Sequence, residues 1–142
     1  MEAKELMLGD WVVYDGDVEY INPIKIEGMD IATESLITSD RDDVGFDGIQ
    51  PIPITPEILE KNGFKLKEEG ETYSEYVSVW DEISIISFAF YKDTICGVDT
   101  LLECELGFAG GLDRIHHCHI KYVHQLQHAL RLCGIEKEIT LK

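Results

Sequence analysis

The chain has 142 residues, 28 acidic and 12 basic side chains, and a formal net charge of −16. A chain of this length buries enough surface to fold without a disulfide or metal, and a hydrophobic fraction of 44% argues against global disorder. The acidic excess disfavours nucleic-acid binding over most of the surface. We expect a cytoplasmic protein that avoids membranes, because the longest apolar stretch covers only residues 83–91 and the start does not resemble a signal peptide.

Residues 1–54 predict a first lobe made of short strands. Runs such as Trp11–Tyr14 are β-branched and aromatic, and turn pairs such as Asp15-Gly16 and Glu27-Gly28 separate them. Several short strands with close connections are typical of a small antiparallel barrel. We predict an SH3-like barrel for this lobe.

Residues 55–64 predict a short helix with both ends marked. Thr55 is the expected N-cap, Pro56 fits the first helical turn, and Asn62-Gly63 supplies a left-handed C-terminal cap. Two helical turns do not persist alone in water, so we expect this helix to pack on a sheet.

Residues 65–142 predict a second lobe, an antiparallel sheet with one C-terminal amphipathic helix. A charged turn is expected in residues 65–71, followed by strands in residues 73–80, 83–91, 101–108 and 115–120. The strand of residues 83–91 is apolar on both faces and should be central. Residues 121–133 show helical periodicity, which Gly134 ends. The predicted fold class is α+β, mainly antiparallel β, either as two lobes or as one continuous domain.

All five histidines lie within thirteen positions, and they are the first place to look for chemistry. In a strand, His117 and His119 would share one face, where they could bind zinc if Cys96 or Cys104 came from a neighbouring strand. We favour the simpler interpretation, a half-exposed strand whose histidines are hydrogen-bonded or stacked. Zinc binding by the cluster His116–His119 stays as an alternative.

The other two histidines, His124 and His128, are four residues apart on the predicted helix. Such a pair can hold zinc in HExxH metalloproteases, but Gln125 stands where the catalytic glutamate would be. Helical geometry places both histidines opposite the apolar stripe, beside Lys121 and Arg131, so we expect them to face solvent. No phosphate-binding loop or nucleophile elbow occurs either. We therefore predict no catalytic residue, metal or cofactor, and favour a non-enzymatic protein over an enzyme.

Three stretches, residues 8–12, 51–64 and 120–127, carry a resemblance. They read Leu-Gly-Asp-Trp-Val, Pro-Ile-Pro-Ile-Thr-Pro-Glu-Ile-Leu-Glu-Lys-Asn-Gly-Phe and Ile-Lys-Tyr-Val-His-Gln-Leu-Gln. Their order and spacing resemble a family of small uncharacterised proteins of gut Bacteroidales and their phages or mobile elements. The resemblance implies a bacterial or phage origin and a cytoplasmic location, and it brings no catalytic residues.

The favoured function is that of a non-enzymatic accessory protein that contacts a protein partner. Aromatic side chains of the first lobe, Trp11, Tyr14 and Tyr20, are the candidate contact residues. A second hypothesis is an acidic mimic of nucleic acid that inhibits a host DNA-binding enzyme, for which the net charge and the expected origin speak. The zinc site is the third hypothesis.

Overall fold

The chain forms two compact units, each described below by itself. The computed structural model describes residues 5–17, 22–41, 43–79, 84–92, 99–108, 116–118, 120–132 and 134–141. The first unit comprises Met1–Pro53 with Tyr122–His128, and the second comprises Ile54–Lys121 with Ala129–Lys142. Residues 122–128, which the sequence assigns to the second lobe, thus belong to the first unit.

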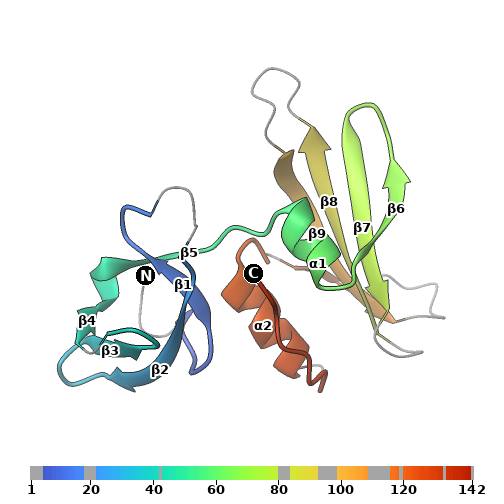
Figure 1. Cartoon of the computed structure of the whole chain (residues 1–142). Coiled ribbons are helices and arrows are strands. Elements are labelled where there is room, and N and C mark those ends of the chain that lie inside the picture. Colours follow the sequence, from blue (N-terminus) through green and yellow to red (C-terminus); the bar gives the residue numbers. More distant parts are fainter. Residues whose placement is uncertain are drawn as a thin grey trace. The chain divides into compact units, whose positions relative to one another are not determined.

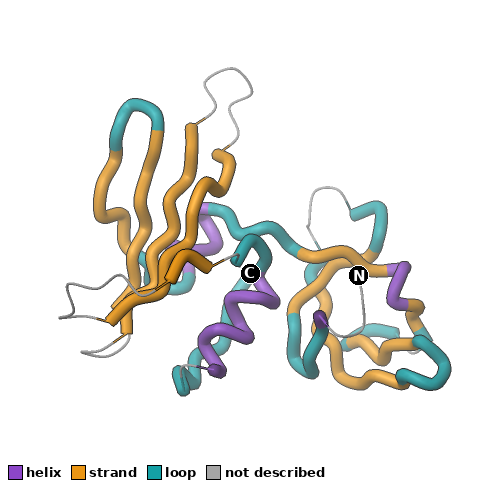
Figure 2. The backbone as a smooth tube through the Cα atoms, turned by 180° about the vertical axis from the view of Figure 1, so that it is seen from behind, coloured by secondary structure: helices purple, strands orange, loops and turns teal. Residues whose placement is uncertain are grey.

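A five-stranded antiparallel sheet makes up most of the first unit (Figure 1). Its strands are β1 (Trp11–Tyr14), β2 (Ile24–Asp30), β3 (Ser35–Thr38), β4 (Val44–Gly45) and β5 (Ile49–Pro51). They are ordered β4-β3-β2-β1-β5, and a 3-10 turn, η2 (Phe46–Gly48), joins the two outer strands (Figure 2). No pairing between β4 and β5 closes the sheet among the described residues. The SH3-like barrel therefore stays a prediction.

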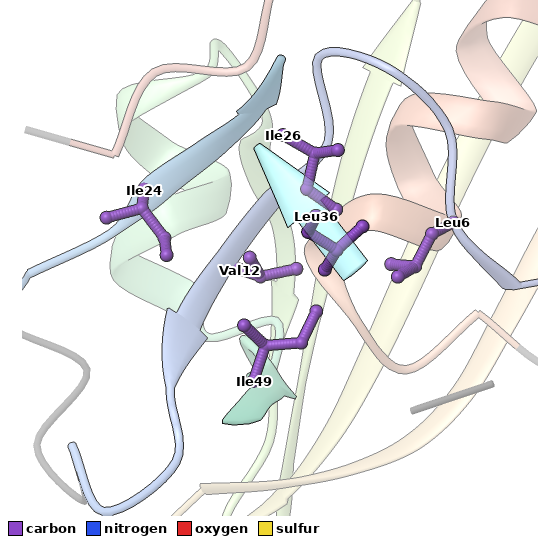
Figure 3. Packing of buried hydrophobic residues seen from close by; sticks show 6 residues of the cluster. All are labelled: Leu6, Val12, Ile24, Ile26, Leu36 and Ile49. Carbon is purple, nitrogen blue, oxygen red and sulfur yellow. The ribbon is translucent and has the colours of Figure 1, made fainter. Parts of the chain in front are cut away.

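The core of the first unit consists of aliphatic side chains from the sheet strands and from the segment before β1. One strand contributes on both faces, since Val12 and Val13 of β1 are both fully buried. Each fully buried aliphatic side chain contributes about 1.5–3 kcal/mol to folding. The core cluster is shown in Figure 3 and consists of Leu6, Val12, Ile24, Ile26, Leu36 and Ile49.

Strand β2 corrects one sequence prediction. The pair Glu27-Gly28, predicted to be a turn between two strands, lies inside β2 at a shift of register between Ile26 and Gly28. Gly28 is opposite Ile37 of β3, whose Cδ1 atom lies 3.0 Å from the place where a Cβ at Gly28 would be. The glycine thus accommodates a close side chain within the sheet and does not reverse the chain.

The second unit contains another five-stranded antiparallel sheet, ordered β10-β9-β8-β7-β6. Its strands are β6 (Lys65–Glu69), β7 (Tyr73–Val79), β8 (Ser84–Lys92), β9 (Asp99–Phe108) and β10 (His116–Cys118). β8 is the middle strand, as predicted from its apolar sequence, and Ile86, Phe88 and Phe90 are fully buried.

The charged segment predicted as a turn in residues 65–71 is largely a strand. All five side chains of β6 are exposed, yet its backbone pairs with β7 from Lys65 to Glu69. The prediction was wrong because it relied on side-chain burial, whereas an edge strand is held by backbone hydrogen bonds. Charged residues on such an edge also disfavour pairing with other chains.

Helix α1 (Pro56–Lys61) has the two ends that the sequence predicts. The Thr55 hydroxyl accepts a hydrogen bond from the Ile58 amide at 3.4 Å, and Gly63 adopts a left-handed conformation with φ +85°. Phe64, directly after the helix, packs edge-on against Phe88 of β8 with ring centroids 5.5 Å apart. This contact attaches the short helix to the sheet, which it needs for stability.

Helix α2 (Val123–Leu132) starts two residues later than the predicted segment 121–133. Gly134, with φ +71°, ends it, and the Gly134 amide donates to the carbonyl of Arg131. Among the described residues no helix has the length and apolarity to span a membrane. With two antiparallel sheets and few helices, the predicted α+β fold class is confirmed.

Candidate functional site where helix α2 meets the start of strand β1

Buried polar side chains gather at one place in the first unit, where α2 meets the residues before β1. Asp10 is fully buried, His124 is 3% exposed and Gln127 is 5% exposed. Buried polar groups of this kind are retained only where hydrogen bonds or function compensate for the lost hydration. These three residues and His128 therefore define the candidate site.

Gln127 extends the hydrogen bonding of β1 with its side-chain amide. Its Oε1 accepts from the Trp11 amide at 3.0 Å, and its Nε2 donates to the Gly9 carbonyl at 3.0 Å. The side chain thus bonds to the two backbone groups that flank Asp10, as a neighbouring strand would. The pairing of β1 with β5 ends at Val12 with Pro51, and the bonds of Gln127 involve the residues directly before that pair.

Asp10 connects the same segment to His128. Its Oδ2 accepts from the Met7 amide at 2.7 Å and lies 2.7 Å from Nε2 of His128. A fully buried carboxylate needs such partners, because burying an isolated charge is costly. The His128 side chain keeps 22% of its exposure, so the pair lies at the edge of the site.

His124 occupies the interior of the site without a hydrogen bond at one nitrogen. Its Nδ1 is buried and has no hydrogen-bond partner. The ring stacks on Tyr122 with an interplanar angle of 9° and meets His128 edge-on, at centroid distances of 5.9 and 5.8 Å. Burial lowers the pKa of His124 below its ordinary 6.5, and although the charge of Asp10 opposes this, His128 acts in the same direction as burial.

The start of α2 is fixed by backbone and side-chain bonds. The Val123 amide donates to the Ile52 carbonyl at 2.9 Å, and Pro53 forms an antiparallel bridge with Tyr122. Gln125 reaches back to accept from the Tyr122 amide at 3.2 Å, which is one half of a capping box. Residues 8–12, 51–53 and 122–127 thus meet in this unit.

The predicted exposure of His124 and His128 is wrong. His124 is buried, and His128 is partly buried and bound to Asp10. Helical periodicity identifies the stripe of Val123, Leu126 and Leu130, all fully buried, but it does not show what covers the neighbouring face. That face contacts the turn of residues 7–10, which is distant in sequence and supplies Asp10. Asp10 and Gln127 were missed for the same reason, although both belong to stretches that carry the resemblance.

Of the three candidate contact residues, the two that the structure describes, Trp11 and Tyr14, do not share a face. Trp11 and Tyr14 are half-buried and three positions apart on β1, which puts them on opposite faces of the strand. The amine of Lys25 lies 4.9 Å from the centre of the Trp11 ring, and the Tyr14 hydroxyl donates to Asp40. Tyr20 lies outside the described residues.

Zinc binding by the histidines of residues 116–119 stays a prediction. In the register of β10 with β9, His117 is opposite Glu105, and Cys104 is opposite Cys118. His119 and Cys96 lie outside the described residues. Across the parts of the chain that the structure describes, no group of three or more His, Cys, Asp or Glu side chains is arranged to hold a metal ion.

The site contains two imidazoles. That of His128 is oriented by Asp10, and that of His124 is buried with a lowered pKa, which favours its neutral form. A carboxylate that fixes His128 is an arrangement that can serve proton transfer, but the bond between Asp10 and His128 and the two bonds of Gln127 also tie α2 to the start of β1. When the chain is compared with family models, curated proteins and solved structures, none of them matches.

Proposed function

We propose that the protein is a non-enzymatic accessory protein that contacts a protein partner through the tip of the β2–β3 hairpin. The observation that carries the proposal is the side chain of Ile31, which is 76% exposed at this tip. Single exposed apolar residues are common on protein surfaces, but Ile31 is part of a hydrogen-bonded turn and is flanked by exposed acids.

The tip is an ordered turn. Oδ1 of Asp30 accepts from the amides of Ala32 and Thr33 at 2.9 and 3.3 Å, and the hydroxyls of Thr33 and Ser35 are 2.8 Å apart. Glu34 has φ +53°, a left-handed conformation that is uncommon for a residue with a side chain. A turn held in this way loses little conformational freedom on binding, which favours affinity.

Further exposed apolar side chains belong to the β2–β3 hairpin or to the turn bonded to it. Ile37 of β3 is 47% exposed and lies against Gly28 of β2. The turn that contains Leu8, which is 56% exposed, is joined to β2 by the bond from the Gly9 amide to the Ile26 carbonyl. These two residues add exposed apolar area to the hairpin and to the turn bonded to it, and burial of apolar area favours protein association.

The charge of the protein indicates the chemistry of the partner. The net charge is −16, and the exposed acids Asp30 and Glu34 flank Ile31. Complementary charge accelerates association and selects the partner. The partner we propose carries an apolar pocket bordered by Lys or Arg. The resemblance to proteins of gut Bacteroidales and their phages directs the search to such a bacterium.

The test compares matched substitutions of exposed apolar residues. Immobilised wild-type protein, Ile31→Gln and Leu132→Gln are incubated with lysate of a gut Bacteroidales bacterium, and retained proteins are quantified. Leu132 is 88% exposed on α2 and serves as the control. We expect a basic protein that wild type and Leu132→Gln retain and Ile31→Gln loses by at least about tenfold, which corresponds to about 1.4 kcal/mol.

A second pair of variants examines the charge. Asp30→Asn keeps the Oδ1 acceptor of the turn and removes one negative charge, so it should weaken capture and reduce its dependence on salt. Retention of the same proteins by wild type and Ile31→Gln contradicts the hairpin contact. A turnover activity abolished by His128→Gln contradicts the non-enzymatic assignment.

A further inference from the structure

We propose that Asp10, His124 and His128 form a proton-sensitive latch, which holds the first half of α2 on the start of β1 at neutral pH and releases it in mildly acidic solution. The latch lies in a different place from the hairpin and does not depend on a partner. Its central residue is His124, a titratable side chain that is buried and whose Nδ1 has no hydrogen-bond partner.

The neutral form of His124 fits its surroundings better than the charged form. A neutral imidazole has one donor and one acceptor nitrogen, whereas the protonated ring has two donors. The buried Nδ1 has no acceptor within hydrogen-bond distance, so a proton there would be a buried donor without a partner. Leaving such a group unsatisfied costs about 1–3 kcal/mol, and more when it is charged.

Charged groups face His124 from each segment around it. From the N-terminal segment, Asp10 and Glu5 favour its charged form, and from α2 itself His128 opposes that form. Tyr122, directly before α2, covers one ring face. Burial is the largest influence, so the pKa of His124 lies below 6.5 in the folded protein despite the two carboxylates.

The direction of the pH effect follows because burial outweighs the two carboxylates and lowers the pKa of His124. A released His124 is hydrated and takes up a proton near its ordinary pKa of 6.5, while the latched ring resists it. As the pH falls below 6.5, protons therefore favour the released state, and the latch weakens until the pH reaches the pKa of the latched ring. The bond between His128 and Asp10 is a further contact of the latch, and His128 opposes a positive charge on His124.

The Trp11 amide can report the release of α2 from the start of β1. The Trp11 amide is bonded to Gln127, three positions after His124 on α2, so its protection against hydrogen exchange depends on the latch. The Leu59 amide is bonded to the Thr55 carbonyl in α1 and belongs to the second unit, where it serves as an internal control.

The experiment measures exchange of both amides in the full chain between about pH 7.5 and about pH 5.5, corrected for intrinsic exchange. If the latched ring stays neutral, protection of Trp11 relative to Leu59 should fall by about tenfold over one unit below 6.5. His124→Phe, an uncharged ring that can also stack on Tyr122, should lose this pH dependence. A constant protection ratio in the wild type, or the same pH dependence in His124→Phe, overturns the latch.

A second measurement on the unmodified protein keeps the test independent of the variant's folding. Nuclear magnetic resonance titration of the His124 ring protons should show protonation below pH 6.5. Titration at or above 6.5 overturns the proposal, because the released state would then gain nothing on acidification.

Discussion

At the residue scale, the most informative side chains of this protein are buried amides that bond to backbone groups. Gln127 bonds to Gly9 and Trp11 in the first unit, and Asn62 has a similar role in the second. Nδ2 of Asn62 donates to the Ile58 and Thr140 carbonyls at 2.8 Å each, and its Oδ1 accepts from the Thr140 amide at 2.8 Å. One side chain thereby joins the end of α1 to the C-terminal segment.

Replacing Asn62 by Ala should destabilise the protein by about 1–3 kcal/mol, because three hydrogen bonds are lost at a position only 3% exposed. The free energy of unfolding, measured by urea denaturation, checks this. Glu60→Ala changes an exposed residue of the same helix and should change stability by no more than about 0.5 kcal/mol. Equal effects of the two substitutions would show that the Asn62 bonds contribute nothing beyond helix propensity.

Two glutamines of α2 offer a residue-scale test of the amide contact with β1. Gln127→Glu keeps the acceptor for the Trp11 amide but replaces the buried donor to the Gly9 carbonyl with an oxygen. The unfolding free energy should therefore fall by about 1–3 kcal/mol. Gln125→Glu keeps its bond to the Tyr122 amide and adds negative charge at the helix start, which should be neutral or stabilising. Denaturation followed by tryptophan fluorescence measures both. Equal losses would contradict the specific role of Gln127.

At the element scale, the short helix and the edge strand depend on the sheet that they accompany. Helix α1 has six residues and is attached through Phe64, which packs edge-on against Phe88 of β8. β6 exposes every side chain and is held by its pairing with β7. Neither element has enough apolar surface of its own to be stable alone, so both should lose stability when the central strand is damaged.

Phe88→Ala should cost about 3–5 kcal/mol of unfolding free energy, since the ring is fully buried and in contact with Phe64. Phe88→Leu, which refills part of the cavity, should cost less. Tyr91 is on the same strand and 49% exposed, so Tyr91→Ala is the matched control and should cost clearly less. A cost for Phe88→Ala no greater than that of the control would contradict the assignment of β8 as the core strand.

At the scale of the whole molecule, net charge is the dominant property. With a formal charge of −16 on 142 residues, repulsion among carboxylates opposes compaction. Such repulsion is long-range and screened by salt, unlike the hydrogen bonds of the candidate site. The same charge is the reason for expecting a basic partner at the β2–β3 hairpin.

Salt should therefore raise the thermal midpoint of unfolding. Between about 0.01 M and about 1 M NaCl the Debye length falls from about 30 Å to about 3 Å, which removes most of the repulsion. Calorimetry at neutral pH, with KCl at equal ionic strength as a control for ion identity, measures the change. A midpoint that falls or stays constant would show that the acids are locally compensated.

The sequence by itself determined the elements whose signals are local. The capped helix α1 follows from Thr55 and Gly63, and the apolar run of β8 identifies the central strand, because caps and continuous burial depend on residues next to one another. The α+β class follows from the same local patterns. Where local pattern and pairing differ, as in β6, the sequence prediction failed.

Only the tertiary structure decided the candidate site. Helical periodicity puts His124 off the apolar stripe of its own helix and so predicts exposure, and Asp10 and Gln127 are separated by more than a hundred positions. Their contact depends on how one helix meets one turn, and periodicity along a single element contains no information about its partner. Whether a histidine is a solvated surface residue or a buried, neutral proton acceptor is therefore decided by the packing around it.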